Sequence, residues 1–224
     1  MIKAIFYKEW IKTRWFLLVS FLTLLSFTGF CLIKLSRIIG LKGGAAHFWE
    51  VMIQRDVVFI ELLQYIPLLI GVVWAIVQFV PEVQRKSLKL TLHLPFSQLK
   101  MTMAMLISGF VLLLSSFLVN LLIITLFFNH YFASELVVQV LLTAAPWFLA
   151  GLAGYLLTSW ICLEPTWRMR ILNSVVSLFL LRILFLSGLP GSYAGFLPTI
   201  TLFIIFFFAL SWISIMRFKE GKQD

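Results

Sequence analysis

The stretch from Met101 to Phe128 reads MTMAMLISGFVLLLSSFLVNLLIITLFF and contains no charged side chain. A helix needs about 20 apolar residues to cross a hydrocarbon core of roughly 30 Å. Backbone polar groups in lipid must find hydrogen-bond partners within their own segment, which an α-helix provides. The stretch therefore predicts a membrane-spanning helix.

Five other runs of similar character surround this one, in a chain of 224 residues that is 62% hydrophobic and only 12% charged. This composition lies outside the usage of soluble globular domains. The first run is too long for the core of a cleaved signal peptide. We therefore expect one all-α integral membrane domain over residues 1–224, with six transmembrane helices at about 16–33, 57–80, 101–128, 136–163, 171–189 and 196–216.

The formal net charge of +9 has an uneven distribution along the chain. Most basic residues lie before the first run, between the second and third, between the fourth and fifth, and after the sixth. The positive-inside rule then places both termini in the cytoplasm of a multi-pass protein of the cytoplasmic (inner) membrane, surrounded by membrane lipids. Because the charges are spread over four segments next to the membrane, we expect no nucleic acid as a partner.

The amino-terminal stretch MIKAIFYKEWIKTRW is too polar to span the membrane. Ile2, Phe6 and Trp10 recur every four residues, whereas Lys8 and Lys12 occupy another face. This pattern predicts a helix that lies in the membrane interface. It would serve either as a simple anchor for the first span or as a specific docking element.

The stretch from Arg85 to Lys100, RKSLKLTLHLPFSQLK, connects the second and third runs. Its leucines alternate with polar residues as in a strand, but an isolated strand would leave its backbone edges unpaired. Wound as a helix that ends at Pro95, the stretch has two apolar edges. Either both edges are buried against the bundle, or one of them binds a partner.

At these residues the chain resembles the type-2 ABC transporter permeases, the membrane subunits of ABC exporters. Glu82, the basic residues after it, the leucines, Pro95 and Lys100 match the segment between the second and third spans of that family, although Lys86 and Ser87 stand where Gly-Thr is usual. YKEW, with Lys8, Glu9 and Trp10, is similar to its elbow helix. The resemblance implies a cytoplasmic coupling helix formed by Glu82, Arg85, Lys86, Leu88, Leu90, Leu92, Leu94 and Pro95.

The resemblance further implies a function. The chain would be the permease subunit of an ATP-driven exporter, working with separate cytoplasmic P-loop ATPase subunits and with a second permease copy or a paralogue. It would have no catalytic or metal site and no cofactor of its own, and ATP and Mg would be bound by the partner. The sequence indeed has no P-loop and no HExxH or CxxC motif. Alternatives are a non-transporting scaffold or sensor subunit and an integral membrane enzyme.

Glu61 and Arg182 are the only charged residues inside the six predicted spans. An ionisable group in a span is costly unless it is paired or hydrated. We hypothesise that the two approach each other and help to fix how the second and fifth helices pack. They could also reach water separately or contact a substrate. Ala150 and Gly154, four residues apart, predict a close helix contact at the fourth span.

Overall fold

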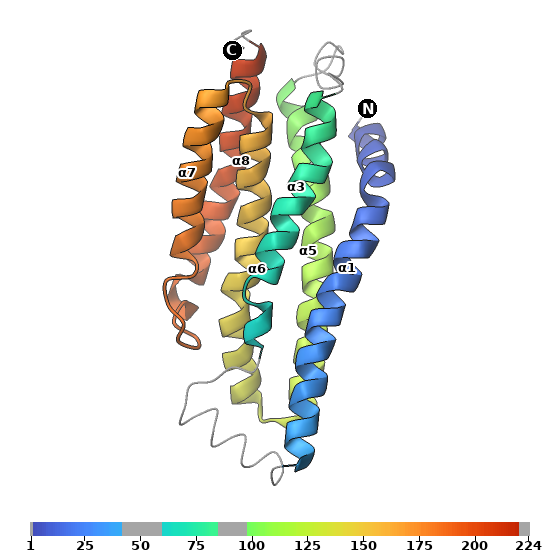
Figure 1. Cartoon of the computed structure of the whole chain (residues 1–224), viewed down its shortest axis with the longest axis vertical. Helices are drawn as coiled ribbons and strands as arrows, with labels where there is room; N and C mark the ends of the chain where they lie inside the picture. The colour runs from blue at the N-terminus through green and yellow to red at the C-terminus, as the bar shows by residue number, and fades with distance from the viewer. Residues whose placement is uncertain (1, 42–59, 85–97, 220–224) are drawn as a thin grey trace.

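A computed structural model of the chain describes residues 2–41, 60–84 and 98–219. These residues form a bundle of helices without a strand among them (Figure 1). In chain order the elements are α1 (Ile2–Leu41), η1 (Glu61–Leu63), α3 (Ile66–Gln84), α5 (Gln98–Tyr131), α6 (Ser134–Leu163), α7 (Trp167–Ile183), η2 (Ala194–Phe196) and α8 (Leu197–Lys219).

Five of these helical segments are long and apolar enough to cross a membrane: α1, η1 together with α3, α5, α6, and η2 together with α8. The chain is therefore an all-α, multi-pass membrane protein. The remaining helix, α7, has 17 residues, which span about 26 Å at 1.5 Å per residue. It corresponds to the predicted fifth span but is shorter than the others.

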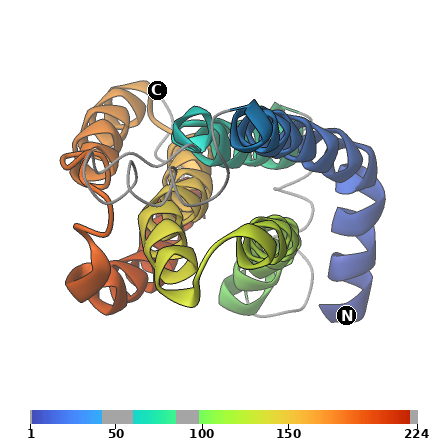
Figure 2. The same ribbon diagram turned by 90° about the horizontal axis from the view of Figure 1, so that it is seen from below.

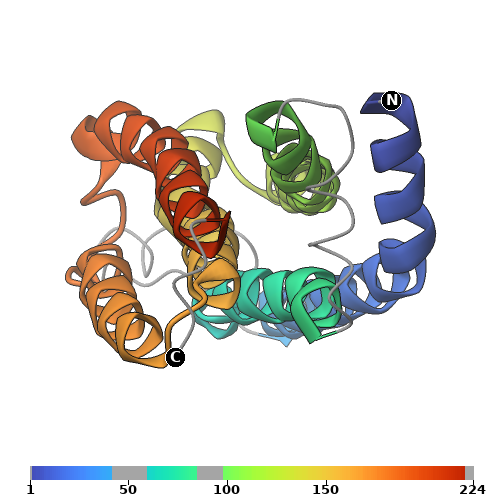
Figure 3. The ribbon, with the colours of Figure 1, turned by 90° about the horizontal axis from the view of Figure 1, so that it is seen from above.

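Helix α6 lies at the centre of the bundle and contacts α3, α5, α7 and α8. Figures 2 and 3, which look along the bundle, show α7 and α8 on one side of α6 and α5 and α1 towards the other. Helix α1 begins and α8 ends at the same end of the bundle (Figure 1). We call this the terminal end and the opposite one the distal end.

The contact between α3 and α6 depends on glycine. A Cβ on Gly71 of α3 would lie 2.0 Å from the carbonyl oxygen of Gly151 on α6. A Cβ on Gly154, one turn along α6, would lie 2.7 Å from a methyl group of Leu68. The predicted close approach at the fourth span is confirmed, and backbone-to-backbone proximity of this kind is typical of packed membrane helices.

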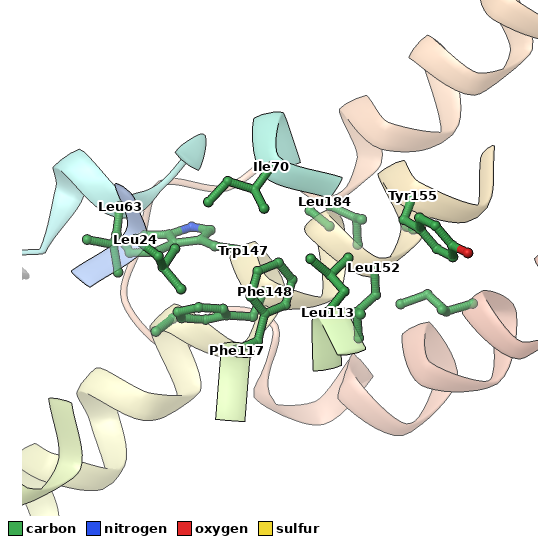
Figure 4. Packing of buried hydrophobic residues seen from close by; sticks show 14 of the residues in the cluster. Leu24, Leu63, Ile70, Leu113, Phe117, Trp147, Phe148, Leu152, Tyr155 and Leu184 are labelled. Atoms are coloured by element: carbon green, nitrogen blue, oxygen red, sulfur yellow. The ribbon is translucent and has the colours of Figure 1, made fainter. Parts of the chain in front are cut away.

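Aromatic rings fill the space between the other helices. Phe117 of α5 and Phe148 of α6 meet edge to face with ring centroids 5.3 Å apart, and Figure 4 shows them beside Trp147, Leu113 and Leu152. Phe16 of α1 and Trp74 of α3 make a similar contact at 5.5 Å. Edge-to-face geometry adds to the gain from tight packing because the positive edge of one ring meets the negative face of the other.

The structure departs from the predicted elements at the amino terminus. The predicted interfacial helix and the first span at 16–33 form one continuous helix, α1. Its first turns are directed away from the axis of the remainder, as the views along the bundle show (Figures 2 and 3). A separate elbow helix is therefore absent from the described residues.

Two other boundaries also differ. The second span ends at Gln84, whereas the prediction placed its end at residue 80. Its described part has a bend after η1, and Pro67 lies in the first turn of α3, where its missing N–H group breaks no hydrogen bond. The fifth helix ends at Ile183, whereas the prediction placed its end at residue 189. The hydroxyl of Tyr193 explains this early end, because it donates to the carbonyl of Ile183 and accepts hydrogen bonds from the N–H groups of Leu186 and Ser187.

Candidate functional site

Two carboxylates are buried near the terminal end, Glu9 on α1 and Glu82 in the last turn of α3, with exposed fractions of 1% and 3%. Lys12 bridges them: its Nζ lies 2.8 Å from Glu9 Oε2 and 2.9 Å from Glu82 Oε1. Lys8 Nζ lies 2.8 Å from Glu82 Oε1 and 3.7 Å from Glu9 Oε1. We call these four residues the carboxylate network.

The charges of this network balance. A buried carboxylate loses hydration energy that only close positive charge and hydrogen bonds can replace. Here two lysines face two glutamates, and the lysine side chains are partly exposed, at 41% for Lys8 and 21% for Lys12. The lysines thus keep part of their hydration while they neutralise the buried pair.

Gln78 extends the network into the bundle. Its Nε2 donates to Glu9 Oε2 and to the carbonyl of Met105 on α5, both at 2.9 Å. Its Oε1 accepts a hydrogen bond from the hydroxyl of Tyr155 on α6 at 2.9 Å, and that hydroxyl also lies 3.0 Å from the carbonyl of Leu106. A single chain of polar contacts therefore joins α1, α3, α5 and α6.

The space for this chain of contacts is provided by Gly109 on α5. A Cβ at that position would lie 2.2 Å from Gln78 Oε1 and 2.4 Å from the hydroxyl of Tyr155. Any side chain there would displace both partners. Because Gln78 and Tyr155 are fully buried, their polar atoms would then have no water to replace the lost hydrogen bonds.

The network contains three of the residues predicted from the family resemblance, Lys8, Glu9 and Glu82, which come from segments about seventy residues apart. Trp10 is 46% exposed and takes no part in the network. The other predicted coupling residues lie outside the described residues: Arg85, Lys86, Leu88, Leu90, Leu92, Leu94 and Pro95. The coupling helix itself stays a prediction.

Glu61 and Arg182, which we expected to approach each other, make no direct ion pair, although both are described. Glu61 is exposed in η1, and Arg182 is exposed in the last turn of α7. The second and fifth helical segments do meet at the distal end, but through rings: Tyr65 stacks on Phe185 with centroids 5.1 Å apart. Stacking between apolar rings avoids the desolvation cost that an ion pair would carry.

A second buried carboxylate site, which the sequence analysis missed, joins the other half of the terminal end. Glu164 follows α6 and is fully buried, and its carboxylate accepts a hydrogen bond from Ser214 of α8 and lies 3.6 Å from Arg217. Arg170 of α7 donates to the backbone carbonyl of Glu164 at 2.6 Å. Helices α6, α7 and α8 are thereby fastened at one point.

The sequence analysis missed Tyr155 and Glu164 of these sites, and only Glu164 has a sequence pattern that could have indicated its role. Tyr155 lies in an apolar run and has the pattern of an ordinary core residue. Glu164 stands in ICLEPTWRMR among basic residues that the charge distribution assigned to topology. A glutamate directly before proline at the end of an apolar run could have been singled out, because Pro165 stops the helix there and leaves its last carbonyls to be satisfied by side chains.

Comparison with family models, with curated proteins and with solved structures finds no match for the chain. Among the described residues, no group of three or more His, Cys, Asp or Glu side chains could hold a metal ion. The carboxylate network fixes the amino-terminal turns of α1 to the end of α3 through the ion pairs of Lys8 and Lys12 with Glu82.

Proposed function

We propose that the chain is the membrane-spanning permease subunit of an ATP-driven exporter and is powered by a separate cytoplasmic P-loop ATPase. It sits in the cytoplasmic membrane with six spans and both termini in the cytoplasm, and it pairs with a second copy or a paralogue. It binds no cofactor of its own, and the partner holds ATP and Mg. This proposal extends the resemblance of the YKEW stretch and the 82–100 stretch to type-2 ABC permeases.

The observation that carries the proposal is the position of the carboxylate network. Glu82 is the first of the predicted coupling residues, and it is held by lysines from the first turns of α1. A subunit that receives force at this segment needs a stiff joint between the segment and its helices. A buried, charge-balanced ion-pair network is such a joint, because separating its partners leaves charges uncompensated in a low-dielectric site.

Force from an ATPase then has a physical route into the bundle. Displacing the end of α3 moves Glu82, and Lys8 and Lys12 carry α1 with it. Gln78 and Tyr155 connect the same motion to α6 at the centre of the bundle. Alternation between inward-open and outward-open arrangements follows when the two ends of this route have two stable packings.

The six-span topology is supported by the positions of the helix ends. Because α1 begins and α8 ends at one end of the bundle, the chain crosses an even number of times between them. Five candidate spans give an odd number, and α7 supplies the missing crossing. At about 26 Å, α7 is slightly shorter than a hydrocarbon core of roughly 30 Å, which local thinning of the bilayer accommodates.

The test is co-purification of the tagged chain from its native membrane under gentle detergent conditions, followed by identification of its partners and measurement of ATP hydrolysis. We expect a P-loop ATPase to accompany the wild-type chain. The Leu90→Asp, Leu94→Asp double variant should lose it, since charges on an apolar docking edge are desolvated at a cost of several kcal/mol.

Arg168→Asp is the matched control. Arg168 is exposed in α7, at the connection between α6 and α7, which also lies at the terminal end. This variant brings a new aspartate to a different connection and should retain the ATPase. The absence of any ATPase from the wild-type preparation would overturn the exporter proposal and favour a scaffold subunit.

A further inference from the structure

An apolar cavity of about 450 Å³ lies between α6, α7 and α8, and it extends from the distal end of α7 to Ala153 and Leu157 of α6. This volume is within the range of roughly 300–1,000 Å³ that is typical of small-ligand sites. Phe203, which lines it, is 57% exposed, so the cavity opens on the surface of the bundle. Residues that line it include Ala153, Leu157, Leu180, Leu184, Ile200 and Phe203.

A second cavity of about 240 Å³ adjoins the first and is lined by polar and apolar groups in similar measure, so it is much more polar than the first. It is lined by Glu61 of η1, by Gln64 directly after η1, and by Thr143 of α6. The turn from Ser187 to Tyr193 completes the lining. Ser187, Ser192 and Tyr193 line both cavities. Among the described lining residues of the two cavities, Glu61 is the only charged one.

The wall between the two cavities is held in place by hydrogen bonds. The hydroxyl of Tyr193 donates to the carbonyl of Ile183 at 2.9 Å and accepts from the N–H groups of Leu186 and Ser187. The N–H of Gly191 donates to Thr143 Oγ1 at 3.0 Å, which fastens the turn to α6. The site is therefore formed before any ligand arrives, and binding requires little ordering of the protein.

We propose that the paired cavities bind an amphiphile with one hydrocarbon chain and a cationic amine head group. The chain occupies the apolar cavity, and the ammonium group lies against the Glu61 carboxylate, with Gln64 and Thr143 as further polar neighbours. A carboxylate favours a cationic head over a neutral or anionic one, because ammonium to carboxylate hydrogen bonds are charge-assisted. That this amphiphile is the exported cargo rests on the proposed function, but its binding does not.

The test uses three probes with the same sixteen-carbon chain, hexadecylamine, hexadecanol and palmitate, so that only the head group differs. The purified chain is placed in nanodiscs of phosphatidylcholine, which have no net charge, and saturable binding of each tritiated probe is measured against empty nanodiscs. No ATPase is present, so failure of binding is distinguishable from failure of the exporter proposal. We expect hexadecylamine to bind about tenfold tighter than hexadecanol, and palmitate to bind weakest.

Three variants locate the binding site. Glu61→Gln should abolish the preference for the amine, whereas Glu135→Gln, which removes an exposed carboxylate in the first turn of α6, should leave it unchanged. Ile200→Trp places a larger side chain at a half-buried cavity position and should weaken all three probes. Equal binding of the three probes, or binding that neither Glu61→Gln nor Ile200→Trp reduces, would show lipid-like adsorption only and overturn the proposal.

Discussion

At the scale of single residues, Lys12 is the lysine that lies within 3 Å of both buried carboxylates of the network. In the Lys12→Met variant, the remaining positive charge near Glu9 is that of Lys8, whose Nζ lies 3.7 Å from Glu9 Oε1. We expect the free energy of unfolding to fall by about 3 kcal/mol or more, the cost of removing one partner of a buried ion pair. The measurement is unfolding by sodium dodecyl sulfate in mixed micelles, followed by circular dichroism.

Lys8→Met and Lys100→Met are the comparisons for this variant. Lys8 is 41% exposed, so its loss should cost under about 1 kcal/mol, as for exposed ion pairs. Lys100 is exposed in the first turn of α5 and reports the effect of removing a positive charge at the terminal end. If the three variants unfolded at the same detergent fraction, the network would not be the joint that we describe.

Tyr155 tests the polar chain that links the network to α6. Tyr155→Phe removes the hydroxyl between Gln78 Oε1 and the Leu106 carbonyl and leaves both acceptors buried. We expect a loss of about 1–3 kcal/mol in the free energy of unfolding, because no water replaces the missing donor. The same detergent titration measures it.

Tyr131→Phe is the matched control, since that hydroxyl makes no hydrogen bond within the described residues and its ring contact with Phe127 is preserved. Its stability should equal that of the wild type. An equally large loss in both variants would mean that the effect arises from the tyrosine ring environment and not from the hydroxyl chain.

The sequence predicted parts of this site for reasons that the structure makes clear. Lys8, Glu9 and Glu82 were found because they stand in recognisable stretches next to the membrane. Their mutual contact was not predicted, because it depends on α1 packing against α3, and no local pattern encodes that packing. Tyr155 was missed because its partner, Gln78, lies on another helix and its own neighbours are apolar.

At the scale of elements, the α3–α6 contact is set by Gly71 and Gly151. Gly71→Ala places a Cβ 2.0 Å from a backbone oxygen, which no rotamer change can relieve. The helices must separate, and we expect destabilisation of about 1–3 kcal/mol or more. Detergent-induced unfolding measures the change.

Gly29→Ala is the matched control, because a Cβ at Gly29 meets nothing within 4 Å. Alanine also restricts the unfolded chain and favours a helix over glycine, so this variant should be as stable as the wild type or more stable by about 0.5–1 kcal/mol. Equal effects of the two substitutions would contradict a close α3–α6 contact and point to a general response to alanine.

Element boundaries were predictable where hydrophobicity alone determines them. The third and fourth spans, predicted at 101–128 and 136–163, lie within α5 and α6 and end within a few residues of them. The end of α7 was not predictable in this way. The apolar residues at 184–186 and Leu189 extend the hydrophobic run beyond the helix. The hydroxyl of Tyr193, ten residues after Ile183, binds the Ile183 carbonyl and two N–H groups just beyond the end of the helix.

At the scale of the whole molecule, the two ends of the bundle have different chemistry. The terminal end holds the carboxylate network and the Glu164 site, and the distal end holds the polar cavity. Helix α6 contributes to both, with Tyr155 near the network and Thr143 at the polar cavity. A motion of α6 at one end can therefore reach the other through one continuous helix, which is what the proposed coupling between an ATPase and a ligand site would require.

The number of membrane crossings depends on whether α7 spans the membrane, and this can be tested. If α7 crosses the membrane, Arg168 at its start and Gly188 just beyond its end lie on opposite sides. In a chain whose Cys31 and Cys162 are replaced by serine, a membrane-impermeant maleimide added to intact cells should label Gly188→Cys and not Arg168→Cys. Permeabilised cells should label both, because both positions are exposed in the structure, and this serves as the control. Labelling of neither site in intact cells would place α7 along the cytoplasmic face and reduce the number of spans to five. The amino and carboxyl termini would then lie on opposite sides of the membrane, in conflict with their common end of the bundle.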